Sequence, residues 1–237
     1  PHGAADPIMT SAVLEMLPTT TGVDRIRLLV TAALEFEGND QDNAVRYAAE
    51  AVSLARQIGD LELECAALNA QVFTHLGPDS RVEFPVVAAD FLSAAKELGD
   101  LAYIATAHWG MFQALSAEGD LPGAVAQMNS GLRSATSGRV GEMVVVLSVY
   151  NAVLDALRGD LDAATRSYQS ASKTLIDAGL PNGANLLLLS RILVAWYQGS
   201  LAHLIDDLLE LYTRVPDRIG WVYAVGLIDA GRTAEAH

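Results

Sequence analysis

Glycines recur along this chain about every twenty residues, and this spacing restricts the possible folds more than any other feature. The series consists of Gly38, Gly59, Gly77, Gly99, Gly119, Gly138, Gly159, Gly179, Gly199 and Gly220. A fixed period of this length is typical of repeat proteins, in which each unit packs on its neighbours in the chain. Two consecutive units give a doublet of about 40 residues.

Several of these glycines open a repeated tripeptide. Gly-Asp-Leu occurs at 59–61, 99–101, 119–121 and 159–161, and Gly-Ser-Leu occurs at 199–201. Glycine is favoured just past a helix end because it adopts a left-handed backbone conformation without strain. Asp and Ser accept hydrogen bonds from the unpaired amides at the start of a helix. Each tripeptide therefore predicts the end of one helix and the start of the next.

Between the glycines, apolar and small residues recur every three or four positions, which is the period of a helix. No segment has the pattern of a strand. We expect helices over 8–17, 24–37, 41–58, 61–76, 83–98, 101–118, 121–137, 141–158, 161–178, 184–198, 201–214 and 218–230. Short turns between so many helices predict an all-α fold. The helices would form antiparallel hairpins stacked as a right-handed superhelical solenoid.

Composition excludes several functional classes. The chain has 237 residues with 29 acidic and 15 basic side chains, so a net charge of −14 argues against a nucleic-acid-binding surface. Cys65 is the single cysteine, which fits a reducing cytoplasm. No membrane-spanning run or signal peptide is visible, and we expect a cytoplasmic protein. The sequence has no phosphate-binding loop, and we expect no cofactor and no metal site.

The helix pairs share a pattern of small residues. Ala44, Ala48 and Ala51 precede Gly59, and similar positions precede Gly179. This pattern resembles tetratricopeptide repeats of a longer-helix variant. The segment 44–60 is similar to repeats in large bacterial regulators of the MalT-like type, which combine a STAND-type ATPase with a LuxR-type DNA-binding domain or a cyclase. The resemblance extends over nearly the whole chain from about Asp24.

The resemblance implies a division of the chain. Residues 1–23 would form an N-terminal segment with a first helix, and residues 24–237 would form the repeat domain. We interpret the chain as a piece of a longer protein whose ATPase and DNA-binding domains flank the repeats. These domains would be partners in the full-length chain, without direct nucleic-acid or membrane contact by the repeats.

In tetratricopeptide stacks, the first helix of each hairpin lines a concave groove. The positions that match this rule here, or lie beside it, run from polar to apolar along the chain. The candidate ligand-binding residues are Asn69, Gln71, Trp109, Gln113, Val149, Val153, Leu189 and Trp196. The apolar members have two interpretations. They form an exposed wall for a small apolar ligand or an amphipathic helix, or they pack on one another as core.

The sequence contains no constellation of catalytic residues. His75 and His108 fall in first helices near the expected groove, but a single histidine is more often a hydrogen-bonded structural residue. Cys65 lies next to Glu64, and a neighbouring acid raises the pKa of a thiol. We therefore expect no enzymatic activity.

These features lead to one favoured hypothesis and two competing ones. The favoured hypothesis is a sensor or coupling region of a bacterial transcriptional regulator that binds a small-molecule effector or a partner protein. A competing hypothesis is an interaction scaffold or homodimerisation module, which exposure of Leu186, Leu189 and Trp196 would favour. An enzyme would require His75 or His108 to face a carboxylate within hydrogen-bond distance.

Overall fold

The computed structural model describes residues 7–37, 40–76, 82–177, 182–214 and 216–236. This part of the chain contains helices and no strand, which confirms the all-α expectation. Its α-helices are α1 (Pro7–Met16), α2 (Gly22–Phe36), α3 (Gln41–Ile58), α4 (Leu61–Thr74), α5 (Phe84–Leu98), α6 (Leu101–Glu118), α7 (Leu121–Ser137), α8 (Gly141–Leu157), α9 (Leu161–Asp177), α10 (Asn182–Gln198), α11 (Ile205–Arg214) and α12 (Pro216–Asp229). Two 3-10 helices, η2 (Ala202–Leu204) and η3 (Thr233–Glu235), complete this part.

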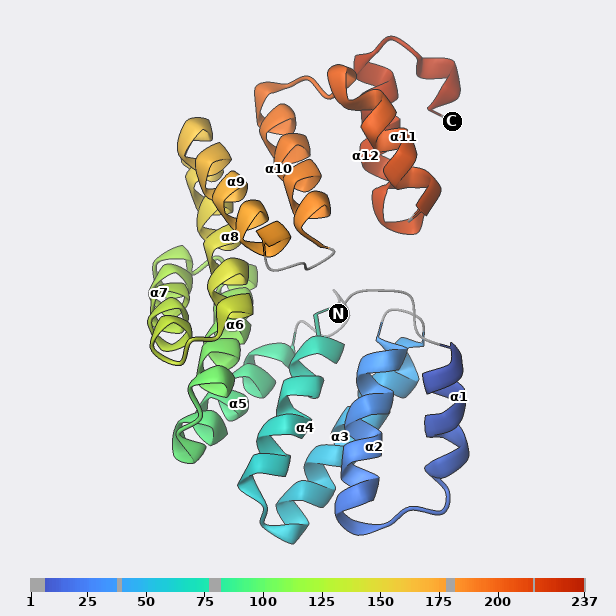
Figure 1. Ribbon diagram of the computed structural model, residues 1–237, viewed down its shortest axis with the longest axis vertical. Coiled ribbons are helices and arrows are strands. Elements are labelled where there is room, and N and C mark those ends of the chain that lie inside the picture. The colour runs from blue at the N-terminus through green and yellow to red at the C-terminus, as the bar shows by residue number, and fades with distance from the viewer. Residues whose placement is uncertain (1–6, 38–39, 77–81, 178–181, 215, 237) are drawn as a thin grey trace. The chain divides into compact units, whose positions relative to one another are not determined.

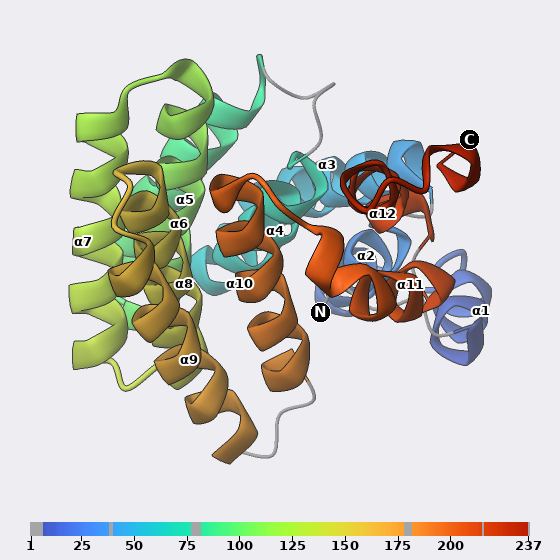
Figure 2. The same cartoon turned by 90° about the horizontal axis from the view of Figure 1, so that it is seen from above.

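The chain divides into two compact units, residues 1–144 and 145–237, with the boundary inside α8. In the first unit, each helix from α1 to α7 packs on the next, as Figure 1 shows by the progression from blue to green. In the second unit, α9 packs on α10 and α11 packs on α12 (Figure 2). The first unit also contains contacts of α2 with α4 and of α4 with α6. Consecutive packing of this kind confirms a helical-repeat character.

The Gly-Asp-Leu turns have the geometry that the sequence predicts. Their glycines adopt φ angles of 75°, 76°, 85° and 86° at positions 59, 99, 119 and 159. The aspartate that follows each glycine accepts a hydrogen bond from a backbone N–H in the first turn of the next helix. At each tripeptide, the left-handed glycine ends one helix and the aspartate caps the first turn of the next. This explains why so short a connection can reverse the direction of the chain.

Gly38, Gly77 and Gly179 of the periodic series lie outside the described residues. Of the glycines in the series that the structure describes, two do not end a helix in this way. At the end of α7, Gly138 has a φ of −79°, and the next residue, Arg139, adopts the left-handed conformation with a φ of 55°. A Cβ on Gly138 would lie 2.8 Å from the Cβ of Leu101, so the close packing leaves no room for a side chain there. Gly220 lies inside α12, where it packs near Tyr212.

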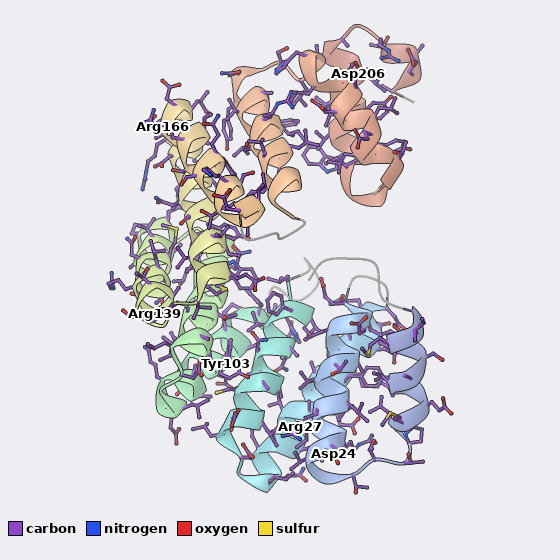
Figure 3. The ribbon with its side chains drawn as sticks, in the orientation of Figure 1. Asp24, Arg27, Tyr103, Arg139, Arg166 and Asp206 are labelled. Carbon is purple, nitrogen blue, oxygen red and sulfur yellow. The ribbon has the colours of Figure 1, made fainter. Side chains whose placement is uncertain are left out.

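Small residues let the helices of the first unit approach closely. Ala33, Ala48 and Ala70 form a buried cluster between α2, α3 and α4. Gly110 of α6 meets α4 and α5, and a Cβ at this position would lie 3.3 Å from Cγ1 of Val72. Edge-on packing of Phe91 and Tyr103, whose ring centroids are 6.0 Å apart, joins α5 to α6. Figure 3 labels Tyr103.

The second unit has its own apolar core. It is built from residues of α10, η2, α11 and α12. Its buried members are Ile192, Ala195, Leu201, Leu204, Leu208, Ile219 and Val222. The expected helix over 201–214 begins as the 3-10 turn η2, and the backbone N–H of Leu201 donates to Oδ2 of Asp229 on α12. Of the helices that the structure describes, none is long and apolar enough to cross a membrane.

Candidate functional site

The candidate site is a cavity of about 890 Å³ in the first unit, between α3 and α5 and over the C-terminal part of α4. We refer to it as the α3–α5 groove. The three helices follow one another in space as in the chain (Figure 1). Its lining residues are Ala49, Val52, Ser53, Arg56, Gln57, Gln71, His75, Val82, Glu83, Val86, Val87 and Asp90. The volume falls in the range of small-molecule sites.

Valines form the middle of the groove. Val52 of α3 and Val87 of α5 are buried, whereas Val82 and Val86 are 82% and 63% exposed. Val86 lies in the first turn of α5, and Val82 lies in the turn just before this helix, so both come from the segment that begins α5. Apolar side chains left open to solvent beside a cavity are a feature of binding surfaces.

One end of the groove is closed by an ionic cluster around Arg56. Nε of Arg56 donates to Oε1 of Glu64 at 2.6 Å, and Nη2 donates to Oδ2 of Asp90 at 3.0 Å. The hydrogen bond with Glu64 raises the pKa of Arg56, with a smaller contribution from Asp90 and an opposing one from burial. One guanidinium therefore links α3 to both α4 and α5.

The other end of the groove contains a buried histidine. His75, which is 7% exposed, directly follows α4, and its Nδ1 lies 2.8 Å from the carbonyl oxygen of Gln71. A carbonyl only accepts, so Nδ1 carries the proton and donates. In the neutral tautomer that carries this proton, Nε2 is the acceptor. The hydroxyl of Thr74 also donates to the Gln71 carbonyl and lies 3.2 Å from Nδ1 of His75.

Two acidic side chains of the same segment reach the groove at opposite ends. Glu83 lies just before α5 at the His75 end, and Asp90 lies on α5 in the Arg56 cluster. Neither residue is buried. The groove thus combines an apolar middle with polar ends.

The structure places one of the predicted ligand-binding residues in this groove. Gln71 is half-buried and lines the cavity, whereas Asn69, Trp109 and Gln113 are not among the lining residues. Trp109 is only 6% exposed, and its ring packs on that of Phe73 at a centroid distance of 5.3 Å. The ring of Trp109 therefore belongs to the contact between α4 and α6.

The apolar candidates divide between two environments. Val149 and Val153 of α8 are half-buried. Leu189 and Trp196 of α10 are 48% and 44% exposed, so they form surface and not core. Trp196 also meets Trp221 of α12 edge-on, with ring centroids 5.5 Å apart, and Trp221 is 61% exposed.

Most of the groove lies outside the positions that the sequence predicts. Those positions are in the first helices of the hairpins, whereas α3 and α5 are second helices and supply Val52, Arg56, Val86 and Asp90. A usable signal was present, because Val82 and Val86 accompany Glu83 and Asp90 at helical spacing. A helix face that is buried in a core consists of apolar residues, so two valines among acidic residues indicate an apolar patch on a solvent-exposed face.

His108 and Cys65, which the sequence also offers as reactive side chains, are buried. Nδ1 of His108 lies 2.6 Å from Oε1 of Gln127, and burial lowers the pKa of this histidine. Burial also raises the pKa of Cys65 to about 11, with Glu64 adding to the shift as the sequence suggests. The described residues contain no group of three or more His, Cys, Asp or Glu side chains that could hold a metal ion.

No protein-family model matches this chain, and a search of curated proteins finds no significant relative. The groove must therefore be interpreted from its own geometry and charge.

Proposed function

We propose that this chain is a non-enzymatic sensor domain that binds a small-molecule effector in the α3–α5 groove. The observation that carries the proposal is the solvent-exposed pair Val82 and Val86 on the wall of a cavity of about 890 Å³. Exposed apolar groups flanked by a few polar ones are how small-molecule sites combine affinity with orientation. The hydrogen bonds of His75 and His108 go to carbonyl, hydroxyl and amide oxygens, which suits structural roles better than catalysis.

The arrangement of the helices suggests how binding is transmitted. A ligand between α3 and α5 touches two successive hairpins, so it sets the distance between them. In a right-handed tetratricopeptide-like solenoid, a small rotation between neighbouring hairpins is passed along the stack. The groove would then couple effector binding to flanking ATPase and DNA-binding domains in a cytoplasmic MalT-like regulator. The ligand changes the equilibrium between two rotational arrangements of the hairpins only to the extent that it binds one arrangement more tightly than the other.

A thermal-shift screen of the chain tests the proposal. Small molecules that occupy the groove should raise the melting temperature of the wild type and not that of Val86→Arg, whose longer charged side chain fills the groove. Val86 is 63% exposed, so this variant should fold normally. Leu121→Arg, at another exposed apolar position, is the matched control and should respond as the wild type does. Compounds that raise the melting temperatures of Val86→Arg and Leu121→Arg by the same amount would contradict the proposed site.

A second candidate function is protein interaction through the C-terminal unit. Exposure of Leu186, Leu189 and Trp196 is the condition under which we expect a scaffold or a homodimer. Leu189 and Trp196 are exposed, whereas Leu186 is half-buried. Light scattering tests it. If the wild type is a homodimer, Leu189→Asp should reduce the measured mass to that of the monomer. A wild type that already has the mass of a monomer would contradict homodimerisation.

A further inference from the structure

We infer that the α3–α5 groove selects a linear organic dication, with an ammonium group at each end and an apolar spacer between them. This inference rests on the proposed function and specifies its ligand class. The inference follows from the order of groups along the groove, which has an acidic side chain at each end and apolar side chains between them.

The two acidic positions set the length of the ligand. Glu83 and Asp90 are seven residues apart along α5 and its N-terminal flank, so their backbones are separated by roughly 10 Å along the helix axis. Val86 and Val87 lie between them in the sequence, and Val52 of α3 lines the same cavity. A methylene chain fits this interval because it buries apolar surface without leaving a polar group unpaired.

At the Arg56 end, negative charge remains after the ionic cluster has formed. Arg56 binds Glu64 through Oε1 and Asp90 through Oδ2, so one positive charge is shared by two carboxylates. The cluster has a net charge of −1 when all three groups are ionised. Asp90 is 48% exposed at its side chain and is therefore accessible to a second cation.

At the His75 end, the acceptors match an ammonium group. The imidazole donates from Nδ1 to the Gln71 carbonyl, and no residue that the structure describes forms a hydrogen bond with Nε2. An ammonium group has three N–H donors. Glu83, His75 and Gln71 all line the cavity, and the acceptors they carry are a carboxylate, Nε2 of the imidazole and a carboxamide oxygen.

The surrounding field favours the same ligand class. Residues 1–144 contain 19 acidic and 8 basic side chains, a net charge of −11, whereas residues 145–237 have a net charge of −3. A strongly negative unit raises the local concentration of cations. Among the charged side chains that the structure describes at the two ends of the groove, an anionic ligand would meet net negative charge at each end.

Isothermal titration calorimetry on the chain at physiological ionic strength tests the inference. The probes are octamethylenediamine, octylamine, which lacks the second charge, and tetramethylenediamine, which is too short to span both ends. We expect octamethylenediamine to bind roughly fivefold more tightly than either, since a partly exposed charge pair contributes up to about 1 kcal/mol. Glu83→Gln and Asp90→Asn should each reduce its affinity by roughly threefold to fivefold.

Matched controls separate a built site from general attraction. Glu118→Gln removes the same charge at an exposed position outside the groove and should leave the affinity unchanged. An equal loss in Glu118→Gln, or equal binding of octylamine and octamethylenediamine, would overturn the inference. If Val86→Arg abolishes stabilisation by neutral or anionic compounds that the wild type prefers, the ligand class is wrong and the proposed function stands. If Val86→Arg alters binding of no compound, both are wrong.

Discussion

Nε of Arg56 lies 2.6 Å from Oε1 of Glu64, and this pair joins α3 to α4 at one end of the α3–α5 groove. Side-chain exposure is 47% for Arg56 and 20% for Glu64, so solvent screens the interaction. We predict a coupling free energy below about 1 kcal/mol in a double-mutant cycle of Arg56→Gln and Glu64→Gln, measured by urea unfolding. A coupling that does not weaken in high salt would contradict a screened ion pair.

Gly110 provides the second prediction, because its lack of a side chain lets α6 approach α4. A Cβ at this position would lie 3.3 Å from Cγ1 of Val72 and 3.7 Å from Cβ of Ala88. We predict that Gly110→Val lowers the free energy of unfolding by about 2 kcal/mol through overpacking. Gly141→Val, at a position with no atom within 4 Å of a built Cβ, is the control and should change it by less than about 0.5 kcal/mol. Equal effects would contradict the close contact.

Arg139 gives the third prediction. It adopts a φ of 55° after α7, where Figure 3 labels it, and a residue with a Cβ is strained in this conformation. We predict that Arg139→Gly stabilises the chain by about 0.5–1 kcal/mol in urea unfolding, although glycine makes the unfolded state more flexible. Gly138→Ala should have the opposite effect, because its Cβ would lie 2.8 Å from that of Leu101. Destabilisation by Arg139→Gly would show that the arginine side chain has a role in the fold.

Much of the fold was predictable from the sequence because its signals are local. A glycine with a left-handed backbone and an aspartate that caps the next helix act within a few residues, so Gly59 and Asp60 define a turn in any tertiary context. The end of α7 at residue 137 was also predicted, but the left-handed residue after it is Arg139 and not Gly138. The sequence does not show this difference, because the contact that leaves no room for a side chain at Gly138 comes from Leu101, far along the chain.

The groove was less predictable because it forms between helices that are separated in sequence. Periodicity shows that Trp109 and Gln71 each lie on α-helices, but not which face meets a neighbouring helix. The structure buries Trp109 against Phe73 and leaves Gln71 in the cavity. That difference depends on the packing of successive hairpins, which no local pattern specifies.

Cys65 gives a prediction about pH. Burial, assisted by the neighbouring Glu64, raises its pKa to about 11 from an ordinary value of 9.0, so the folded protein keeps the neutral thiol at neutral pH. We predict that iodoacetamide labels Cys65 far more slowly in the native chain than in urea, since only the thiolate is reactive. Native labelling should accelerate between pH 9 and 11. Rapid labelling at pH 7 would contradict the buried position.

His108 gives a second pH dependence, of known sign. Burial is the main cause that lowers its pKa below 6.5, and Lys96 and Arg133 act in the same direction against the hydrogen bond with Gln127. The unfolded state therefore takes up this proton first as the pH falls. The contribution of His108 to the free energy of unfolding is therefore complete above pH 6.5 and decreases as the pH falls from 6.5 toward the lower pKa of the folded state. We predict that His108→Gln flattens the fall in melting temperature below this pH, and an unchanged slope would contradict the prediction.

The most direct test of the binding site is methyl NMR of valine-labelled protein during titration with octamethylenediamine, octanoate and octanol. These probes share an apolar chain and differ in charge. We predict that the methyl signals of Val52, Val86 and Val87 shift with the diamine while the signals of Val149 and Val153 stay in place. If none of the three probes moves the groove signals, the α3–α5 groove is not the ligand site.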